Sequence, residues 1–531
     1  MDSIMSGLLK TRRELIKALA LATIAIPLSN SVWAQKKFDK NPFILGVASG
    51  SPTDQSIVLW TRLVDEGVFG SNLPNEPIEV KWELASDREF SKILKSGVSL
   101  AVPALAYSVH TEVKQLPANQ WFFYRFQVGG AISTVGRTRT LPAADQTVAQ
   151  LRLAYASCQQ YEHGYFSAYK HMLAENLDLV LFLGDYIYEY GPSRKGVRVH
   201  DSPPVISLDD YRKRYVLYKQ DKNLQAMHAA CPWLMTWDDH EVQNDYAGLN
   251  PGTFGPYVSD FPKRRAAAYQ AYYEHMPIPS SALIGGIDGL MKGSEMRIYG
   301  DFRYGKLANI CVLDDRQYRD SDVCTPSGNG SSIVDPKTCP ELENASRTIL
   351  GDRQEKWLIE KLKDSNKNIW NVVGQPTLYA QRYLPSGDKL LIWNDGWDGF
   401  PAARKRIDQA LIDNKVKNLV IFGGDVHENW VGYIKADYNK PDSTVLGVEF
   451  CGTSITSIGN GGKYLDARLA RNPHFVFAEA TKKGYGVAEF TPNALTVNLR
   501  IVSDAQQEDA TIETLAKFVV RAGSNKIERI S

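Results

Sequence analysis

The sequence predicts a mixed α/β protein with a small β domain in front of it, and three observations support this prediction. From Phe43 to about Pro142 the chain has short runs of β-branched and aromatic residues, separated by Pro and Gly, without a convincing helical pattern. From Leu151 onward, apolar runs of strand length alternate with stretches of helical periodicity. The chain has 531 residues, which is too long for one ordinary core, so we expect at least two domains.

Residues 1–34 have the pattern of an export signal. The stretch T-R-R-E-L-I-K at Thr11–Lys17 precedes the apolar residues Ala18–Leu28, and Ala34 provides a small-residue cleavage site. The paired arginines indicate export by the twin-arginine machinery, which carries folded proteins. The apolar stretch is too short to span a membrane, so we expect cleavage after Ala34 and a periplasmic or secreted protein. An uncleaved amphipathic helix is the alternative.

The overall charge argues against several classes of partner. The full chain has 61 basic and 60 acidic residues, and residues 1–34 contain four basic and two acidic ones, which leaves 57 and 58. A nearly neutral mature chain does not predict a nucleic-acid-binding surface or attraction to an anionic membrane. After the signal, no apolar run approaches the roughly 18 residues that a transmembrane helix needs, so we expect no transmembrane segment in the mature form.

Residues 41–142 are predicted to form an immunoglobulin-like or fibronectin-like β-sandwich. The rhythm of about 100 residues with short strands and turn signals is typical of such modules. This region has no cluster of chemically active side chains, which favours a scaffold; a ligand-binding module is the alternative. The strand candidates are Ile57–Thr61, Ile78–Leu84, His110–Val113 and Trp121–Val128.

Residues 150–503 are predicted to form an α/β catalytic domain, followed by a C-terminal extension at 504–531. Asp352 and Glu355 have the spacing of a capping box, which predicts a helix start. Within the extension, residues 514–520 fit a helix and a strand equally well. The expected helices are Phe166–Asn176, Asp209–Tyr218 and Lys263–His275, and the expected strands are Leu151–Ala156, Leu179–Leu183, Asn371–Gln375 and Asn418–Phe422.

Reactive side chains follow four of the strand-like runs. Leu179–Leu183 ends at Gly184 and is followed by Asp185 and Tyr188, and Leu151–Ala156 is followed by Cys158. Open α/β sheets place ligand chemistry at the carboxyl ends of their strands. The other two ends carry W-D-D-H-E at 237–241 and F-G-G-D-V-H at 422–427. Together they offer one thiol, one phenol, two imidazoles and several carboxylates, which suffice for two metal ions.

The combined motifs resemble those of the PhoD-like alkaline phosphatases, within the wider calcineurin-like metallophosphoesterases. The motifs are A-S-C-Q at 156–159, G-D-Y-I-Y-E at 184–189, W-D-D-H-E at 237–241, L-D-D-R-Q-Y-R at 313–319 and G-G-D-V-H at 423–427. They follow a twin-arginine signal and a small β domain, and the resemblance covers nearly the whole mature chain. It implies two facing sheets flanked by helices, with a two-metal centre between the sheet ends.

The resemblance also implies roles for individual residues at the first metal. Asp185 matches the aspartate that bridges both metals, and Tyr188 matches the tyrosine that purple acid phosphatases place on ferric iron. Cys158 stands where other branches have their first Asp-x-His block. A thiolate, a phenolate, a carboxylate and the His427 imidazole suit Fe³⁺ better than Ca²⁺. For Cys158 an inert buried thiol is the alternative, and for Tyr188 a core aromatic.

The second metal is assigned to oxygen ligands in the same way. Asp239 stands where the wider superfamily has the Asn of its G-N-H-[DE] block. Asp425 replaces the first His of the superfamily's G-H-x-H block, and His427 matches the second His of that block. Asp185, Asp239 and Asp425 offer only oxygen, which suits Ca²⁺, with Mn²⁺ or Mg²⁺ as alternatives. The resemblance implies Ca²⁺, and zinc is disfavoured because few imidazoles and thiolates converge. Asp238 is either a further ligand or the residue that orients His240.

These assignments predict an exported alkaline phosphatase or phosphodiesterase that hydrolyses phosphate esters by metal-activated hydroxide. His240 is expected to stabilise phosphoryl oxygens or protonate the leaving alkoxide. Arg316 is expected to hold a phosphate oxygen or position a carboxylate, with a structural salt bridge as the alternative. Gly452–Ser454 and Trp393–Phe400 are candidates for the mouth of the site. The alternative functions are a phospholipase D-type phosphodiesterase and an exported, non-catalytic protein that binds metal or phosphate.

The six cysteines do not form a disulfide scaffold. Cys324 and Cys339 flank a loop rich in Gly, Ser and Pro, and in an oxidising compartment they are a plausible pair. Cys231, Cys311 and Cys451 lie in apolar, strand-like surroundings, which predicts inert core thiols.

Overall fold

The computed structural model describes residues 38–64, 73–253, 255–282, 295–326 and 328–531. The predicted export signal at 1–34 lies outside these residues. The chain divides into two compact units: the first comprises Met1–Leu141, Val205–Trp233 and Pro262–Ile298, and the second comprises Pro142–Pro204, Leu234–Phe261 and Tyr299–Ser531. Within the described residues, no helix has the length and apolar character needed to cross a membrane. The predicted domain boundaries stay predictions.

The first unit contains the predicted strands of the β domain. One set pairs antiparallel in the order β1-β2-β5 and the other in the order β4-β3-β6-β7, with β8 on β6. Their inward side chains, among them Leu59, Val80 and Phe122, form one buried core. The bounds are β1 (Val47–Gly50), β2 (Ile57–Arg62), β3 (Ile78–Ala85), β4 (Ile93–Ala101), β5 (Ser108–Val113), β6 (Trp121–Val128), β7 (Ala131–Ile132), β8 (Gly136–Arg139) and the helices α3 (Leu208–Lys219), α4 (Lys222–Ala230) and α5 (Phe261–His275).

The second unit contains two large sheets and one small sheet. In the first, the strands follow the order β25-β24-β23-β22-β9-β10-β11; in the second, β12-β13-β15-β18-β20-β19-β21; the small sheet is β14-β17-β16. The first sheet contains β9 (Leu151–Ala156), β10 (Leu179–Leu183), β11 (Trp233–Thr236), β22 (Gly484–Phe490), β23 (Ala494–Val502), β24 (Ile512–Arg521) and β25 (Ile527–Arg529). The others contain β12 (Gly300–Tyr304), β13 (Ala308–Val312), β14 (Ile333–Val334), β15 (Trp370–Gly374), β16 (Leu384–Ser386), β17 (Lys389–Trp393), β18 (Leu419–Gly423), β19 (Asn429–Lys435), β20 (Val445–Cys451) and β21 (Phe475–Glu479).

Aromatic side chains join the two large sheets of the second unit. Tyr155 on β9 stacks on Phe422 on β18 with ring centroids 4.4 Å apart, and Phe450 on β20 meets Phe518 on β24 at 6.1 Å. The two sheets therefore face each other across a shared apolar layer. Within them, β9 and β10 run parallel, as do β13, β15, β18 and β20. Parallel strands end at the same edge of a sheet, so the segments that follow them gather there.

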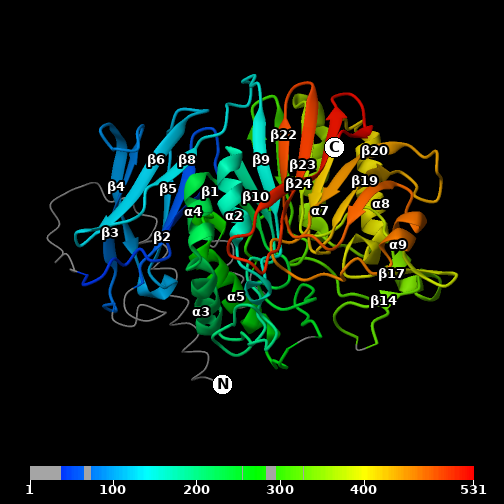
Figure 1. Ribbon diagram of the computed structural model, residues 1–531, viewed down its shortest axis with the longest axis horizontal. Helices are drawn as coiled ribbons and strands as arrows, with labels where there is room; N and C mark the ends of the chain where they lie inside the picture. Colours follow the sequence, from blue (N-terminus) through cyan, green and yellow to red (C-terminus); the bar gives the residue numbers. More distant parts are fainter. Residues whose placement is uncertain (1–37, 65–72, 254, 283–294, 327) are drawn as a thin grey trace. The chain divides into compact units, whose positions relative to one another are not determined.

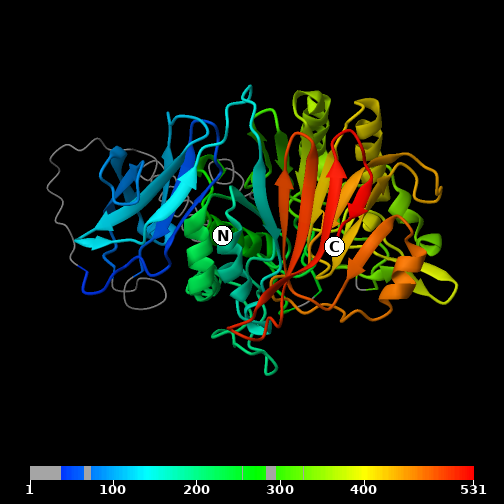
Figure 2. The same ribbon diagram turned by 45° about the horizontal axis from the view of Figure 1, so that its top comes forward.

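Two helices cover the outer face of the second large sheet. The apolar sides of α7 (Gly351–Lys363) and α8 (Pro401–Asp413) join the sheet residues Val373, Leu419 and Ile421 in one buried cluster. Figure 1 and Figure 2 show the orange-to-red strands β22 to β24 beside β9, so the C-terminal segment completes the first sheet. The remaining helices of the second unit are α2 (Ser167–Met172) and α9 (Leu465–Arg471).

The mixed α/β prediction is confirmed, with two differences in detail. The undecided segment 514–520 lies in strand β24, paired to β23 over its length, so long-range pairing decides between the two states. The predicted capping box of Asp352 and Glu355 is wrong, because no side chain caps α7 at its N-cap residue. Thr348 Oγ1 accepts the Gly351 N–H at 2.9 Å instead, and the Glu355 carboxylate pairs with Arg406.

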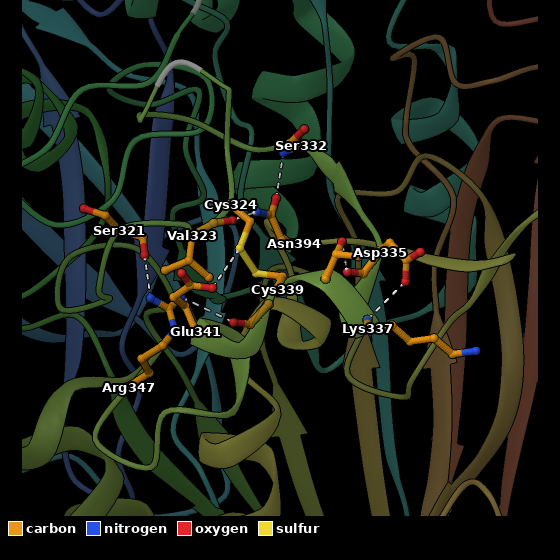
Figure 3. Close-up of a disulfide and its surroundings, with 12 residues drawn as sticks. Ser321, Val323, Cys324, Ser332, Asp335, Lys337, Cys339, Glu341, Arg347 and Asn394 are labelled. Carbon is orange, nitrogen blue, oxygen red and sulfur yellow. Dashed lines mark hydrogen bonds between the residues drawn. A yellow bond between two sulfur atoms is a disulfide. The ribbon is translucent and has the colours of Figure 1, made fainter.

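Cys324 and Cys339 form a disulfide, with their Cα atoms 6.0 Å apart (Figure 3). Asn394 joins the enclosed loop to the chain that follows β17: its side chain donates to the Val323 carbonyl at 2.7 Å and accepts the Ser332 N–H at 2.6 Å. The other four cysteines are free thiols, and all four are buried.

Candidate metal centre

The predicted site residues of the second unit converge where its parallel strands end. Cys158 follows β9, Asp185 follows β10, and Asp425 and His427 follow β18. All four have left-handed backbone, with φ of 59°, 59°, 64° and 57° respectively. This conformation is costly for residues other than Gly and is concentrated at functional sites, where it turns side chains in directions that a regular strand does not allow.

Gly184 allows two of these strand ends to approach each other. Its φ is +91°, and a Cβ atom placed on it would lie 2.5 Å from the Asp238 Cβ. A side chain at this position would therefore push apart the loops that carry Asp185 and Asp238.

One part of the site, which we call the thiol half, contains Cys158, Tyr188 and His427. A ligand atom of Cys158, one of Asp185 and one of His427 lie within 4.8 Å of one another. The Tyr188 hydroxyl donates to Asp185 Oδ2 at 2.8 Å and lies 3.3 Å from His427 Nε2. The Ser457 hydroxyl donates to the Tyr188 oxygen at 2.7 Å. The structure thus brings together all four residues that we assigned to the first metal.

Burial keeps the thiol half uncharged in the absence of a cation. Burial, with the nearby Asp185 carboxylate, raises the pKa of the Cys158 thiol and that of the Tyr188 hydroxyl well above their ordinary values. Burial lowers the pKa of His427 to about 3, so its imidazole is neutral and able to bind a metal. A cation bound here would therefore displace protons from sulfur and oxygen.

The other part, which we call the carboxylate half, contains Asp238, Asp239 and Asp395 around Arg316. The Arg316 guanidinium makes two parallel hydrogen bonds to Asp395, at 2.7 and 2.6 Å. Its Nε donates to Asp238 Oδ1 at 2.5 Å, and one terminal nitrogen lies 3.6 Å from Asp239 Oδ2. Arg316 is only 1% exposed, and its donors are directed to these carboxylates. This geometry favours the role of positioning carboxylates over that of holding a phosphate oxygen.

Burial and neighbouring charges shift the pKa values of the carboxylates in this half. Burial opposes ionisation of Asp239, but Arg316 and His240 outweigh it and lower its pKa to about 2. Burial raises the pKa of Asp238 to about 6, against the effect of Arg316. Burial, together with Asp238 and Asp395, raises the pKa of Asp425 well above its ordinary value. Thr377 Oγ1 donates to Asp425 at 2.9 Å, and this carboxylate is only half-buried.

His240 lies between the two halves, and Glu189 holds it. Its Nδ1 lies 2.8 Å from Glu189 Oε2, and its ring packs on Tyr188 with centroids 4.0 Å apart. Glu189 therefore orients the imidazole, which is the role that we considered for Asp238. Burial opposes protonation, but Asp239, Asp185 and Glu189 together raise the pKa of His240 well above its ordinary value.

The donor arrangement fits cations. Among the buried carboxylate oxygens of the described residues that have no hydrogen-bond partner, three belong to these two halves, namely Asp185 Oδ1, Asp238 Oδ2 and Asp239 Oδ1. Unpaired buried carboxylate oxygens are costly, and a metal ion satisfies them. Asp185, Asp239 and His240 form a second group of ligand atoms within 4.8 Å, so Asp185 belongs to both groups. Asp238 and Asp425 belong to no such group within the described part of the chain.

Four acidic residues of the site were not predicted from the sequence as site residues, namely Glu189, Glu241, Asp245 and Asp395. Asp239, Asp245 and Asp395 form a third buried group of ligand atoms within 4.8 Å. Glu241 accepts the backbone N–H groups of Asp185, at 3.2 Å, and of Asp238, at 2.9 Å, and so fastens one loop to the other. Glu189 and Glu241 stand inside the motifs that we quoted, and Asp395 stands in the Trp393–Phe400 segment. The position of Asp395 in that segment was the only sequence signal for its role.

Comparison with known proteins gives consistent matches over most of the chain. A family model described as PhoD-like phosphatase matches residues 153–499, and one described as PhoD-like phosphatase, N-terminal domain, matches residues 28–142. The chain is 42% identical over 536 residues to alkaline phosphatase D of Bacillus subtilis (strain 168), covering 98% of this chain and 89% of that protein. A solved structure described as "Structure of PhoD" superposes with a TM-score of 0.86 at 43% identity, covering 93% of each chain.

Proposed function

Because the chain belongs to the PhoD-like phosphatase family and is a phosphoric ester hydrolase, we propose that it is an exported alkaline phosphatase and phosphodiesterase with a mixed-metal centre. One observation carries this proposal: Asp185 supplies ligand atoms to two adjacent groups of different chemistry. A shared carboxylate between two such groups suits a two-metal site. We further assign the two facing sheets of the second unit to a metallophosphoesterase core and the β strands of the first to a β-sandwich.

The proposed metals follow from the donor chemistry of the halves. Cys158, Tyr188, Asp185 and His427 would hold Fe³⁺, because thiolate and phenolate donors stabilise a trivalent ion. Asp185, Asp239 and Asp425, with Asp238 beside them, would hold Ca²⁺, or Mn²⁺ or Mg²⁺ in its place, since their donors are carboxylate oxygens. When bound, such a pair of cations makes a water more acidic and neutralises phosphate oxygens.

The protein side chains supply positioning and a proton. His240 is held through Nδ1 by Glu189, so its other nitrogen, Nε2, serves as the donor to a phosphoryl oxygen or to the leaving alkoxide. Arg316 keeps Asp238 and Asp395 in place, and Glu241 fixes the backbone of the loops that carry Asp185 and Asp238. Preorganised groups of this kind cost no rearrangement during the reaction.

The activity is tested with two substrates, 4-nitrophenyl phosphate and bis(4-nitrophenyl) phosphate, after reconstitution with Fe³⁺ and Ca²⁺. We expect hydrolysis of both, and His240→Asn should lower kcat about 100-fold or more, as for the loss of a general acid. His171→Asn serves as the control for loss of an imidazole, because His171 is partly buried and donates to the Ala510 carbonyl, away from the site. Absence of turnover with both esters in the reconstituted protein would refute the proposal, and turnover of the diester alone would favour a dedicated phosphodiesterase.

Export by the twin-arginine machinery is part of the same proposal. It rests on the paired arginines Arg12 and Arg13 ahead of an apolar stretch, and the Cys324–Cys339 disulfide suits an oxidising compartment. Replacement of both arginines by lysine should keep the protein inside the cell. Cell fractionation with activity and immunodetection measures this, and unchanged export of the double variant contradicts the proposed route.

A further inference from the structure

A cavity of about 360 Å³ lies in the second unit, next to the thiol half. Its lining includes His163, Ile458, Lys482, Lys483 and Gln506. The volume is within the range of roughly 300–1,000 Å³ that small-molecule sites occupy. None of these residues has a role in the chemistry proposed above.

The cavity and the thiol half share a wall made of residues 457–459. On the side of the metal centre, Ser457 donates to the Tyr188 oxygen, and the Ile458 carbonyl lies 3.0 Å from His427 Nδ1. On the side of the cavity, the Ile458 N–H donates to His163 Nδ1 at 3.1 Å. The cavity is therefore separated from the predicted metal ligands Tyr188 and His427 only by this short segment.

The cavity offers unused donors. Lys483 is half-buried, and its ammonium donates to the His427 carbonyl at 3.2 Å. It has no ion pair with any carboxylate in the described part of the chain, so two of its three N–H bonds are available. Because His163 Nδ1 accepts a hydrogen bond, the neutral ring carries its proton on Nε2, for which the described residues provide no acceptor.

The nearby acidic side chains are already engaged. Glu428 accepts both terminal nitrogens of Arg468, at 2.7 and 2.9 Å, and Glu479 accepts the N–H groups of Thr481 and Lys482. Asp504, on the rim, accepts the Gln506 N–H at 2.8 Å. Backbone N–H groups leave the Glu479 and Asp504 carboxylates charged, but the lining holds two cations, Lys482 and Lys483, against one anion, Asp504, so its net charge is positive.

We propose that this cavity is a leaving-group subsite that binds an anionic group on the departing alcohol of a phosphodiester, with Lys483 as its anchoring cation. This inference rests on the proposed function. In the reaction, a water oxygen bonds to phosphorus, the bond from phosphorus to the departing oxygen breaks, and that oxygen takes up a proton. The products are a phosphomonoester and a free alcohol that still carries its anionic group.

The experiment compares two substrates that differ by one carboxylate. Glycerophosphoserine releases serine, and glycerophosphoethanolamine releases ethanolamine, so each reaction is followed by its free alcohol as well as by glycerol 3-phosphate. We expect the metal-loaded wild type to have the higher kcat/KM for the serine diester. Lys483→Met should reduce the ratio of the two kcat/KM values about tenfold, which corresponds to the loss of one partly buried charge pair.

Three further variants isolate the charge. Lys483→Arg keeps the cation and should keep most of the preference. Gln506→Glu adds a negative charge on the cavity wall without touching His427, and should lower the preference for the serine diester even where Lys483→Met fails to fold. Lys363→Met removes an exposed lysine that pairs with Glu360 on α7, and should change neither kcat/KM value.

The outcomes separate this inference from the proposed function. Failure of the wild type to hydrolyse bis(4-nitrophenyl) phosphate overturns the proposed function. The subsite alone is overturned if the wild type hydrolyses that ester but has equal kcat/KM values for the serine and ethanolamine diesters. It is also overturned if the wild type hydrolyses that ester but turns over neither of the two diesters. A serine preference that neither Lys483→Met nor Gln506→Glu reduces also overturns it.

Discussion

The two halves of the metal centre balance their buried charge in different ways. In the carboxylate half, Arg316 places a fixed positive charge between Asp238 and Asp395. In the thiol half, by contrast, the Cys158 thiol donates to the Ser157 hydroxyl at 3.2 Å, and Tyr188 donates to Asp185. Arg316 therefore favours ionised oxygen ligands in one half, against the effect of burial, whereas burial keeps Cys158 and Tyr188 protonated in the other.

This difference predicts two kinds of metal binding. The carboxylate half is held in place by the protein, and Asp239, whose pKa is lowered, binds a cation without releasing a proton, whereas Asp425, whose pKa is raised, must release one. The thiol half must lose protons from Cys158 and Tyr188, so binding there depends on pH and favours an ion of high charge. The predictions below test this contrast, from the largest expected effect to the smallest.

Asp185→Asn should affect metal binding in both halves, because Asp185 belongs to the ligand group with Cys158 and His427 and to the one with Asp239 and His240. An amide lacks the negative charge that a bridging ligand supplies, so we expect activity to fall by about 10³-fold or more and metal content to fall at both positions. Phosphodiesterase assays and elemental analysis measure these two quantities. Asp301→Asn on β12 is the control for loss of a carboxylate, since Asp301 pairs with Lys361 at the surface. Retention of both metals with near-normal turnover would show that Asp185 does not bridge.

Arg316→Met should affect the carboxylate half alone. Removal of one partner of a buried ion pair leaves uncompensated charges and costs about 3–5 kcal/mol in the free energy of unfolding. Millimolar Ca²⁺ should restore part of this loss, because a cation bound by the same carboxylates replaces the missing charge. Chemical unfolding with and without Ca²⁺ measures the effect.

Arg404→Met is the matched control for this prediction. Arg404 is also buried and pairs with Asp398 at 2.8 Å, but it belongs to α8. Its loss should destabilise the protein without Ca²⁺-dependent recovery. Equal recovery of both variants would show that Ca²⁺ acts elsewhere.

The contrast also explains which parts of the site are predictable from the sequence. Cys158 and Asp185 follow recognisable strands, and parallel strands bring their ends together, so their convergence could be inferred before the structure was known. Asp395 belongs to a loop without periodicity, and its role depends on Arg316, 79 positions away in the sequence. Long-range partners of this kind have no local signature.

The same limit applies to the fold. Strand β24 is defined by its pairing with β23, and the start of α7 by Thr348, which lies outside the predicted capping box. By contrast, α3 has its capping box at Ser207 and Asp210, and our helix at Asp209–Tyr218 is confirmed within one or two residues. Local patterns predicted elements well where the stabilising contacts were themselves local.

Tyr188→Phe and Cys158→Ser should change the thiol half with smaller effects on activity. Both anions donate charge to ferric iron, so the iron-loaded protein should absorb visible light, and each substitution should shift or weaken that band. Phe keeps the ring, and Ser replaces the thiol by a hydroxyl that stays protonated near neutral pH. We expect activity to fall about 10- to 100-fold, because the acidity of bound water depends on the ligand charge. A colourless wild type with full iron occupancy would count against both ligands.

Glu449 sharpens the comparison, because in the described part of the chain no guanidinium hydrogen-bonds to this buried carboxylate and it belongs to no group of metal-ligand atoms. It is fully buried on β20 and accepts the N–H groups of Tyr379 and Ala380 at 2.7 and 2.8 Å. Burial outweighs these hydrogen bonds and raises its pKa from 4.5 to about 7. The folded protein therefore holds this proton more tightly than the unfolded chain, so the group stabilises the fold below pH 4.5 and loses this contribution as the pH rises through about 7.

Glu449→Gln should remove this pH dependence. The full pH-dependent contribution of Glu449 to the free energy of unfolding is on the order of 3 kcal/mol, at about 1.4 kcal/mol per pKa unit. The substitution should change stability and leave turnover and metal content unchanged. Gln has one acceptor oxygen, so a constant loss of about 1 kcal/mol accompanies the change at every pH. Urea unfolding at pH 5 and pH 8 gives the difference for each protein, and Glu360→Gln, an exposed residue on α7, controls for the loss of a charge. If wild type and Glu449→Gln lose the same stability between the two pH values, burial alone does not keep a carboxylate protonated in this fold, and the contrast between the halves must then come from Arg316 rather than from desolvation.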